Sequence, residues 1–263
     1  MMKSFNKYVL LLGMACAQAY AGDASSSLQV RICEDSAEWP PYSYVAVENC
    51  QRTERVEGLA VDIAREILES KGVEFQLDLH PWKRCLHEVA RGEQYQMVLS
   101  ASSNEERRAT YLFSEPYYET HPYYFYSKKQ YPEGLQIQSL KDLARYTIGG
   151  IAGYNYEYLG VTSDQVNWES IDYRHLILKL HHRKVDVFVE QIEIIRGFDQ
   201  VGKNFLDDPD LGYAPLPDME PTPFHMLFTN DERGAELKRI VDEGLQQLRQ
   251  SGRRDQLFKR YFP

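Results

Sequence analysis

Two serines and an arginine form the pattern in this sequence that best predicts a chemical function. Ser100 and Ser102 follow an apolar run at residues 97–99 that is typical of a buried strand, and Arg107 lies five residues after Ser102. Small hydroxyl residues after a strand leave backbone N–H groups free to bind an anion, and their hydroxyls add donors. An arginine at this distance can reach back and hold a carboxylate through two hydrogen bonds. The pattern favours non-covalent binding of an acidic group, with a serine loop beside a surface arginine as the alternative.

Candidates for acid–base chemistry are few. They are Glu190, which follows an apolar run at residues 185–189, and Glu38, which lies in a segment rich in proline and aromatic residues. An enzyme needs such a group positioned in its cleft. The sequence shows no nucleophile–base pair and no cofactor-binding loop. We therefore predict no catalytic residue and no cofactor.

Alternating strand and helix patterns predict two α/β units that position these residues. In the first unit, strands are expected at residues 29–33, 75–79 and 97–99, and helices at 58–71 and 82–90. In the second unit, strands are expected at 123–126, 147–151 and 185–189, and helices at 140–143, around Tyr156 and at 175–182. Strands separated by helices are typical of parallel sheets.

The C-terminal part of the chain begins with four prolines, at positions 215, 217, 221 and 223. They predict a stiff connector, because proline fixes φ and removes a hydrogen-bond donor. A strand at 225–229, an amphipathic helix at 236–248 and a last helical turn or two at 255–261 are expected after it.

The N-terminus has the pattern of a secretory signal peptide. Lys3 and Lys7 are followed by an apolar run at residues 8–17 and by a small-x-small sequence that ends at Ala21. We predict a signal peptide over residues 1–21 and a periplasmic location. Cys16 as a lipid-attachment site is the less favoured alternative, since Gly13 stands where a lipobox usually has leucine.

The composition narrows the range of partners. The 263-residue chain has a formal net charge of −9, and removal of the two lysines of the signal peptide makes it more negative. An acidic protein repels nucleic acid and anionic lipid, so neither is a predicted partner. The nineteen tyrosines favour a binding surface, with a tyrosine-rich core as the alternative.

An ordered set of motifs resembles the bacterial extracellular solute-binding proteins of family 3, the polar amino-acid receptors of ABC importers. The motifs are Trp-Pro-Pro-Tyr (39–42), Gly-Leu-Ala-Val-Asp-Ile-Ala (58–64), Pro-Trp-Lys-Arg (81–84), Arg107, Phe-Ser-Glu-Pro-Tyr (113–117) and Ile-Gly-Gly-Ile-Ala-Gly (148–153). Each motif is weak alone, but together they cover nearly the whole mature chain at the expected spacings.

The resemblance implies an α/β fold of the type II periplasmic binding protein class, with two Rossmann-like lobes joined by two hinge crossings. The crossings are expected near residues 117–122 and 213–223. Lobe 1 would comprise residues 22–119 and 222–263, and lobe 2 residues 120–221. The ligand would lie in the cleft between them.

The resemblance also assigns roles in lobe 1, residue by residue. Arg107 holds the position of the family's carboxylate-binding arginine, and Ser100 and Ser102 hold those of its carboxylate-binding loop. Trp39 stands where an aromatic residue covers the ligand, and Trp82 where an apolar residue lies opposite. Two indoles can sandwich a flat, apolar or cationic group, although both would also suit lobe packing.

In lobe 2, Gly153, Tyr154 and Asn155 are expected to begin a helix whose N–H groups face the cleft. One departure concerns the aspartate that usually holds the ligand ammonium, five residues after the aspartate that starts the second-lobe strand. Counting from Asp186 gives Gln191, and Glu190 lies one position earlier. A shift of one residue in a strand changes the face, so which of the two faces the cleft stays open, and so does an ordinary α-amino-acid ligand.

Three cysteines remain in the mature chain, and their spacings match no zinc site. Export implies an oxidising compartment, hence one disulfide and one cysteine left over. Cys33 ends the first expected strand and Cys85 lies in the first turn after the second. Adjacent parallel strands would bring those ends together, which favours Cys33–Cys85, with Cys33–Cys50 as the alternative.

The resemblance implies a monomeric periplasmic binding protein that captures a small polar ligand, an amino acid or a related carboxylate, and delivers it to an inner-membrane ABC permease. It implies no enzymatic activity. The alternatives are an enzyme on the same fold, similar to cyclohexadienyl dehydratase, and a ligand-sensing receptor component.

Overall fold

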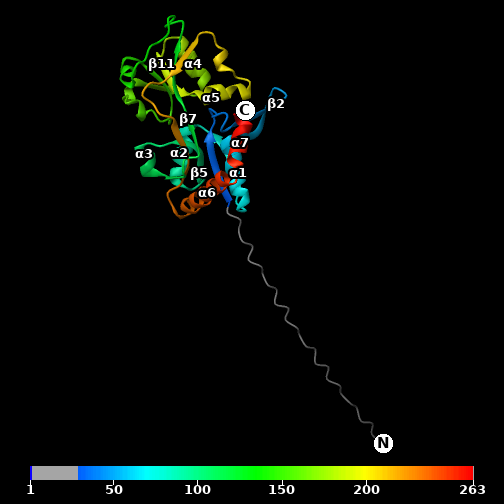
Figure 1. Cartoon of the computed structure of the whole chain (residues 1–263). Coiled ribbons are helices and arrows are strands. Elements are labelled where there is room, and N and C mark those ends of the chain that lie inside the picture. Colours follow the sequence, from blue (N-terminus) through cyan, green and yellow to red (C-terminus); the bar gives the residue numbers. More distant parts are fainter. Residues whose placement is uncertain (2–28, 263) are drawn as a thin grey trace.

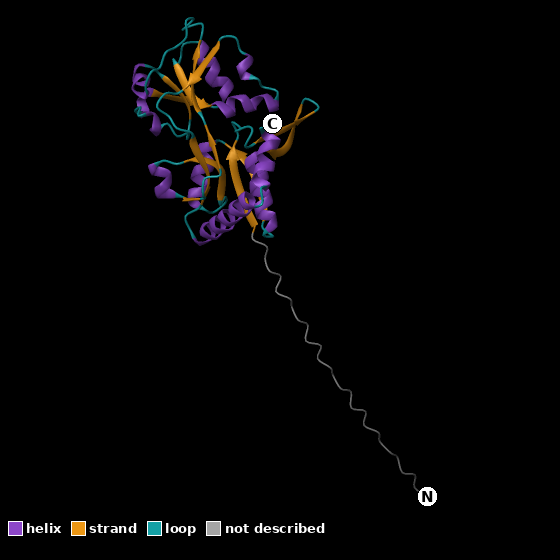
Figure 2. Ribbon diagram, in the orientation of Figure 1, coloured by secondary structure: helices purple, strands orange, loops and turns teal. Residues whose placement is uncertain are grey.

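The structure is a computed structural model that describes Met1 and residues 29–262. The predicted signal peptide, apart from Met1, and Cys16 lie outside the described residues. Figure 1 shows two bodies, each built on its own sheet, and Figure 2 shows helices around both sheets. We call the body with the first sheet lobe 1 and the body with the second sheet lobe 2.

The sheet of lobe 1 has the strand order β4-β1-β5-β13-β6, and β7 also pairs with β13. Its strands are β1 (Gln29–Asp35), β4 (Glu74–His80), β5 (Met97–Ser102), β6 (Leu112–Phe113), β7 (Tyr118–Thr120) and β13 (Thr222–Phe228). The helices of this lobe are α1 (Leu59–Ser70), α2 (Trp82–Arg91), α3 (Glu105–Thr110), α6 (Glu232–Gln250) and α7 (Arg253–Tyr261). β1 runs parallel to β4 and β5, as expected, whereas β13 is antiparallel to β5.

Lobe 2 has a five-stranded sheet in the order β10-β9-β11-β8-β12. Its strands are β8 (Pro122–Ser127), β9 (Ile148–Ile151), β10 (Val166–Ser170), β11 (Val187–Gln191) and β12 (Leu211–Pro215). Two α-helices, α4 (Tyr173–His181) and α5 (Ile192–Gly197), accompany 3₁₀ turns at Leu140–Arg145, Glu157–Leu159, Ser163–Gln165, Phe198–Val201 and Phe205–Asp207. A hairpin of β2 (Tyr44–Glu48) and β3 (Gln51–Glu57) projects from lobe 1 (Figure 1).

Close helix packing stabilises lobe 1. The buried face of α1 includes Ile63 and Ile67, and α6 buries Leu237 and Val241. Gly244 lets the two helices approach, because a Cβ atom there would lie 2.5 Å from the Cγ2 atom of Ile67. The apolar stripes predicted for these two helices therefore lie in the core, where burial contributes about 25 cal/mol per Å2 of apolar surface.

The chain passes between the sheets twice. Thr120 pairs with Thr222 in the sheet of lobe 1, whereas Pro122 pairs with Gln191 in the sheet of lobe 2, so the first passage is at His121. The second passage is the segment 216–221 between β12 and β13. Both ends of the described chain therefore belong to lobe 1. Pro215 and Pro223 lie in strands, so only the middle of the predicted proline connector is irregular.

Several predicted elements differ from the structure. The helix expected around Tyr156 was wrong: Gly153 has a φ of +87° and the Tyr154 N–H donates to the carbonyl oxygen of Ile151, which makes a turn followed only by a short 3₁₀ turn. The helix at 140–143 is a 3₁₀ helix. The β2–β3 hairpin, β10 and α5 were not predicted.

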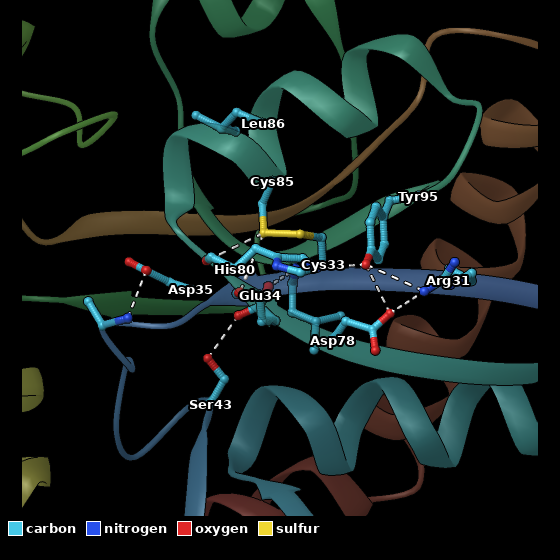
Figure 3. Close-up of a disulfide and its surroundings, with 12 residues drawn as sticks. Arg31, Cys33, Glu34, Asp35, Ser43, Asp78, His80, Cys85, Leu86 and Tyr95 are labelled. Carbon is cyan, nitrogen blue, oxygen red and sulfur yellow. Dashed lines mark hydrogen bonds and ion pairs between the residues drawn. A yellow bond between two sulfur atoms is a disulfide. The ribbon is translucent and has the colours of Figure 1, made fainter. Parts of the chain in front are cut away.

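A disulfide joins Cys33, near the carboxyl end of β1, to Cys85 on α2, with a Cα–Cα distance of 5.3 Å (Figure 3). The favoured pairing is confirmed and Cys33–Cys50 is wrong. Cys50 is exposed at the tip of the β2–β3 hairpin and forms no disulfide within the described residues. Over the described residues, no helix combines the length and the apolar character needed to cross a membrane.

Candidate functional site

A cavity of about 50 Å3 lies between the two lobes and takes its walls from both. Lobe 1 contributes Glu34, Asp35, Trp39, Trp82, Ser100, Ser102, Arg107, Thr222 and Phe224, and lobe 2 contributes Tyr154, Asn155, Tyr156, Tyr158, Val189, Glu190 and Gln191. All eight residues that the sequence nominated for a ligand site are among them. Residues that are distant in the sequence therefore meet in one place.

The side chain of Arg107 makes hydrogen bonds to both lobes. Its backbone is fixed at the start of α3, where the Asn104 side chain accepts a hydrogen bond from the Arg107 N–H at 2.8 Å. Its Nη1 donates to the Ser102 carbonyl oxygen at 2.8 Å, and its Nη2 donates to the Gly153 carbonyl oxygen of lobe 2 at 2.9 Å. Burial lowers the pKa of the guanidinium to about 10, so Arg107 stays a cation at neutral pH.

The two serines lie in a strand and not in the loop that was predicted. β5 continues to Ser102 because β13 pairs with it, Phe224 opposite Ser102. The hydroxyl of Ser100 is buried and has no hydrogen-bond partner among the described residues. The hydroxyl of Ser102 accepts hydrogen bonds from Arg107 and from the Asn155 amide of lobe 2, each at 3.3 Å. Both side chains are therefore placed as donors beside Arg107.

Aromatic rings form much of the remaining wall. Trp39 is 8% exposed, donates from Nε1 to the Tyr118 hydroxyl at 3.2 Å and meets the Tyr154 ring edge-on at 5.6 Å. Trp82 is the first residue of α2, and the Arg107 guanidinium lies 5.8 Å from its ring centroid. The helix N-terminus expected at Gly153 is not formed, so lobe 2 contributes phenol and amide groups to the cavity in its place.

Glu190 and Gln191 both line the cavity, and they differ in what they contact. Glu190 accepts hydrogen bonds from the Tyr173 hydroxyl at 2.9 Å and from the Gln191 N–H at 2.7 Å. Burial raises the pKa of its carboxyl to about 8. The Gln191 side chain accepts from Thr120 at 2.9 Å, beside the first passage between the lobes. β11 ends at Gln191, so side chains no longer alternate between the two faces of the sheet there, and both residues can line the cavity.

Two acids in the cavity were missed in the sequence. β1 extends to Asp35, past the expected end at Cys33, because Asp35 pairs with His80 of β4. Asp35 accepts a hydrogen bond from the Tyr154 hydroxyl at 2.8 Å, and burial raises its pKa to about 6. The sequence could have indicated both acids, because they are adjacent at the carboxyl end of a parallel strand, and ligands of open α/β sheets bind at that edge.

Glu34 is the more internal of the two acids. It accepts from the Leu99 N–H at 2.6 Å and from the Ser43 hydroxyl at 2.8 Å, as Figure 3 shows for Ser43. Burial raises its pKa to about 7. Glu38, one of the two acids considered for catalysis, lies outside the cavity and accepts hydrogen bonds from Arg52 and Lys203.

Comparison with known proteins agrees with this geometry. Residues 31–263 match the bacterial extracellular solute-binding proteins, family 3. The chain belongs to this family. A probable histidine-binding protein of Neisseria gonorrhoeae is 20% identical over 256 residues, which cover 92% of this chain and 86% of that protein.

Solved structures of amino-acid-binding proteins share the fold. An amino acid ABC transporter substrate-binding protein, AbpA of Streptococcus pneumoniae bound to L-arginine, gives a TM-score of 0.71 with 24% identity, over 89% of this chain and 94% of that one. The arginine-, lysine-, histidine-binding protein ArtJ of Geobacillus stearothermophilus gives 0.69 with 19% identity, over 89% and 95%. The predicted two-lobed type II fold and the solute-binding class are confirmed.

The cavity of this family-3 binding protein is acidic. One guanidinium faces three carboxyl groups, those of Glu34, Asp35 and Glu190. Across residues 29–262, no three His, Cys, Asp or Glu side chains gather in a way that could hold a metal ion. The arrangement suits a ligand with one acidic group and at least one positive charge, enclosed by aromatic rings.

Proposed function

We propose that this protein is a periplasmic receptor for an amino acid with a positively charged side chain, which it delivers to an ABC permease of the inner membrane. The observation that carries the proposal is the charge of the cavity, where Arg107 of lobe 1 faces buried acids from both lobes. The names of two relatives support it, since AbpA is bound to L-arginine and ArtJ is named for arginine, lysine and histidine.

The carboxylate of the ligand would bind at Arg107. The guanidinium has five N–H donors, and its bonds to Ser102 and Gly153 leave others for a carboxylate. The Ser100 hydroxyl adds a neutral donor. Charge-assisted hydrogen bonds of this kind are roughly twice as strong as neutral ones, so this end of the cavity would fix the orientation of the ligand.

The positive groups of the ligand would bind at Asp35 and Glu190. Each carboxylate already accepts hydrogen bonds, but its oxygens have further lone pairs. A cation within about 4–6 Å favours the ionised form of a carboxyl, which opposes the effect of burial. A cationic ligand would thus supply the charge that these two buried acids otherwise lack.

Binding would close the cleft. Contacts that cross between the lobes at the cavity include Tyr154 with Asp35, Asn155 with Ser102, and Arg107 with Gly153. We place the end of the first segment of lobe 1 at Thr120, one residue beyond the predicted limit at 119, and lobe 2 at residues 122–221, with the hinge at the two chain passages. A ligand that touches both lobes shifts the equilibrium towards the closed form. The protein would act as an exported monomer.

Titration calorimetry of the mature chain tests the ligand class. The panel is L-arginine, L-lysine, L-histidine, L-glutamine and L-glutamate at pH 7.5. We expect the cationic amino acids to bind at least tenfold more tightly than glutamine, and glutamate not to bind. Equal or tighter binding of glutamate would overturn the assignment of Asp35 and Glu190, because an extra negative charge beside buried carboxylates is unfavourable.

An enzyme on the same fold is the second candidate, because buried acids with raised pKa values are also typical of general acids. The cavity argues against a cyclic substrate with several carboxylates, since it has a single cation, Arg107. A turnover assay with cyclohexadienyl carboxylates distinguishes the two. We expect product to form no faster than in buffer alone. Steady turnover by the parent chain that is lost in Glu190→Gln would overturn the proposed binding function in favour of an enzyme.

A further inference from the structure

Four side chains lie in a row of close polar contacts beside the cavity, from Glu190 of lobe 2 through Tyr173 and Tyr154 to Asp35 of lobe 1. The Tyr173 hydroxyl donates to Oε2 of Glu190 at 2.9 Å, and the Tyr154 hydroxyl donates to Oδ2 of Asp35 at 2.8 Å. The two phenol oxygens lie 3.4 Å apart. The two acids that we assign to the ligand's positive groups are thus connected through two tyrosines.

The protons in this row have one consistent arrangement. Each phenol has one proton. If Tyr154 donates to Asp35 and Tyr173 donates to Glu190, both short contacts are satisfied, and the long contact between the phenols is the one without a proton. Each carboxylate then accepts a hydrogen bond from a neutral donor, which favours its ionised form against the effect of burial.

We propose that Tyr173 is a positioning residue, whose hydroxyl orients the Glu190 carboxylate towards the ligand's positive group. The proposal deepens the proposed function and rests on it for the ligand. Apart from Tyr173, the hydrogen bond to the Glu190 side chain comes from the next N–H in the chain, that of Gln191. Tyr173 is therefore the neighbour from a different element that determines where this carboxylate points.

Among the side chains around Glu190, Tyr173 differs from the others in donating a hydrogen bond to the carboxylate. Tyr154, Tyr156 and Tyr158 face it from the segment after β9, and Asp35 faces it from β1. None of these residues donates a hydrogen bond to Glu190 within the described chain.

The hydroxyl of Tyr173 is not needed for packing. The side chain is 1% exposed at the first position of α4, and its ring meets Phe198 at 5.1 Å, a contact that phenylalanine would also make. Burial of a phenol costs free energy unless its hydroxyl has a hydrogen-bond partner. Phenylalanine would fill the same space in the core without that requirement. The hydroxyl therefore points to a role at Glu190.

The test compares Tyr173→Phe with Tyr124→Phe as the matched control. Tyr124 is also buried in lobe 2, and its hydroxyl donates to the Leu135 carbonyl oxygen at 2.9 Å, away from the cavity acids. In the ligand-free protein, the carboxyl carbon of Glu190 is followed by NMR against pH and assigned with Glu190→Gln. We expect its titration midpoint to rise in Tyr173→Phe and to be unchanged in Tyr124→Phe.

Calorimetry with L-arginine gives the second readout. We expect Tyr173→Phe to bind about tenfold more weakly at pH 7, as for loss of a hydrogen bond to a charged group. The loss should shrink as the pH rises to 9, because Glu190 ionises there without help. A packing defect would give a loss independent of pH.

The two proposals fail in different ways. An unmoved NMR midpoint in Tyr173→Phe overturns the role of Tyr173, whatever binds. A raised midpoint in a protein that does not bind L-arginine supports the role of Tyr173 and overturns the proposed ligand class.

Discussion

The Arg107 guanidinium of lobe 1 donates a hydrogen bond to the carbonyl oxygen of Gly153 in lobe 2, at 2.9 Å. The same side chain holds Ser102 in its own lobe. A single buried cation is thus in contact with both walls of the cavity. Gly153 can lie this close to lobe 1 because it has no side chain. A Cβ atom there would lie 3.0 Å from the Cα atom of Lys83, on α2 of lobe 1.

Arg107→Ala should weaken ligand binding by at least about thirtyfold, since truncation of one member of a buried charge pair costs about 2–5 kcal/mol. Titration calorimetry with the best ligand of the panel measures the loss. Arg108→Ala is the matched control, because Arg108 lies next on α3 but is exposed, does not line the cavity and donates to the Ser103 hydroxyl. Unchanged affinity in Arg107→Ala, with a folded protein by circular dichroism, would remove Arg107 from the site.

Binding of a cationic ligand should strengthen as the pH rises from 5 to 8. Burial raises the pKa of Asp35 to about 6 and that of Glu190 to about 8. Both must ionise to hold a cation, so binding releases protons below these values and is stronger above them. Calorimetry in two buffers of different ionisation enthalpy measures the released protons. Affinity that is constant across this range would contradict the prediction.

The parts of the site that the sequence predicts are those carried by motifs. Arg107 and the serines stand in a local pattern, and the resemblance located both tryptophans. Asp35 was missed because its strand extends only through pairing with His80, a contact across the sheet that local composition does not reveal. A charged residue after a short apolar strand looks like the start of a loop.

The wrong helix at Gly153 and the unnoticed Tyr173 have similar causes. The turn at Gly153 packs against the backbone of Lys83, in the other lobe. The local sequence, which predicted a helix starting at Gly153, contains no information on that contact. Tyr173 looks like one aromatic residue of an apolar helix stripe. Its partner, Glu190, lies 17 positions along the chain in a different element, so only the fold shows what the hydroxyl does.

The ligand-free protein should lose stability as the pH rises from about 5 to 8. A carboxyl whose pKa is higher in the folded protein than in the unfolded chain contributes stability that is complete below the unfolded value, about 4, and is lost as the pH passes the folded value. Glu34 and Glu190, with values of about 7 and 8, both have this sign. Scanning calorimetry should show a falling Tm, with a shallower fall in Glu190→Gln. Glu220→Gln, at an exposed position, is the control and should follow the parent chain.

Removal of the disulfide should weaken both the fold and the site. Cys33 directly precedes Glu34 and Asp35 on β1, and Cys85 lies one turn after Trp82 on α2, so the bridge ties two walls of the cavity together. Cys33→Ala/Cys85→Ala should lower the free energy of unfolding by about 2–5 kcal/mol, measured by urea denaturation.

The matched control is Cys50→Ser, because Cys50 is exposed on the hairpin and has no disulfide partner among the described residues. In that variant, stability and affinity should equal those of the parent chain. In the double variant, ligand affinity measured at a temperature where the protein is fully folded should also fall, because Asp35 and Trp82 are no longer held at a fixed separation. An unchanged affinity there would mean that the strand and the helix hold these two side chains without the bridge.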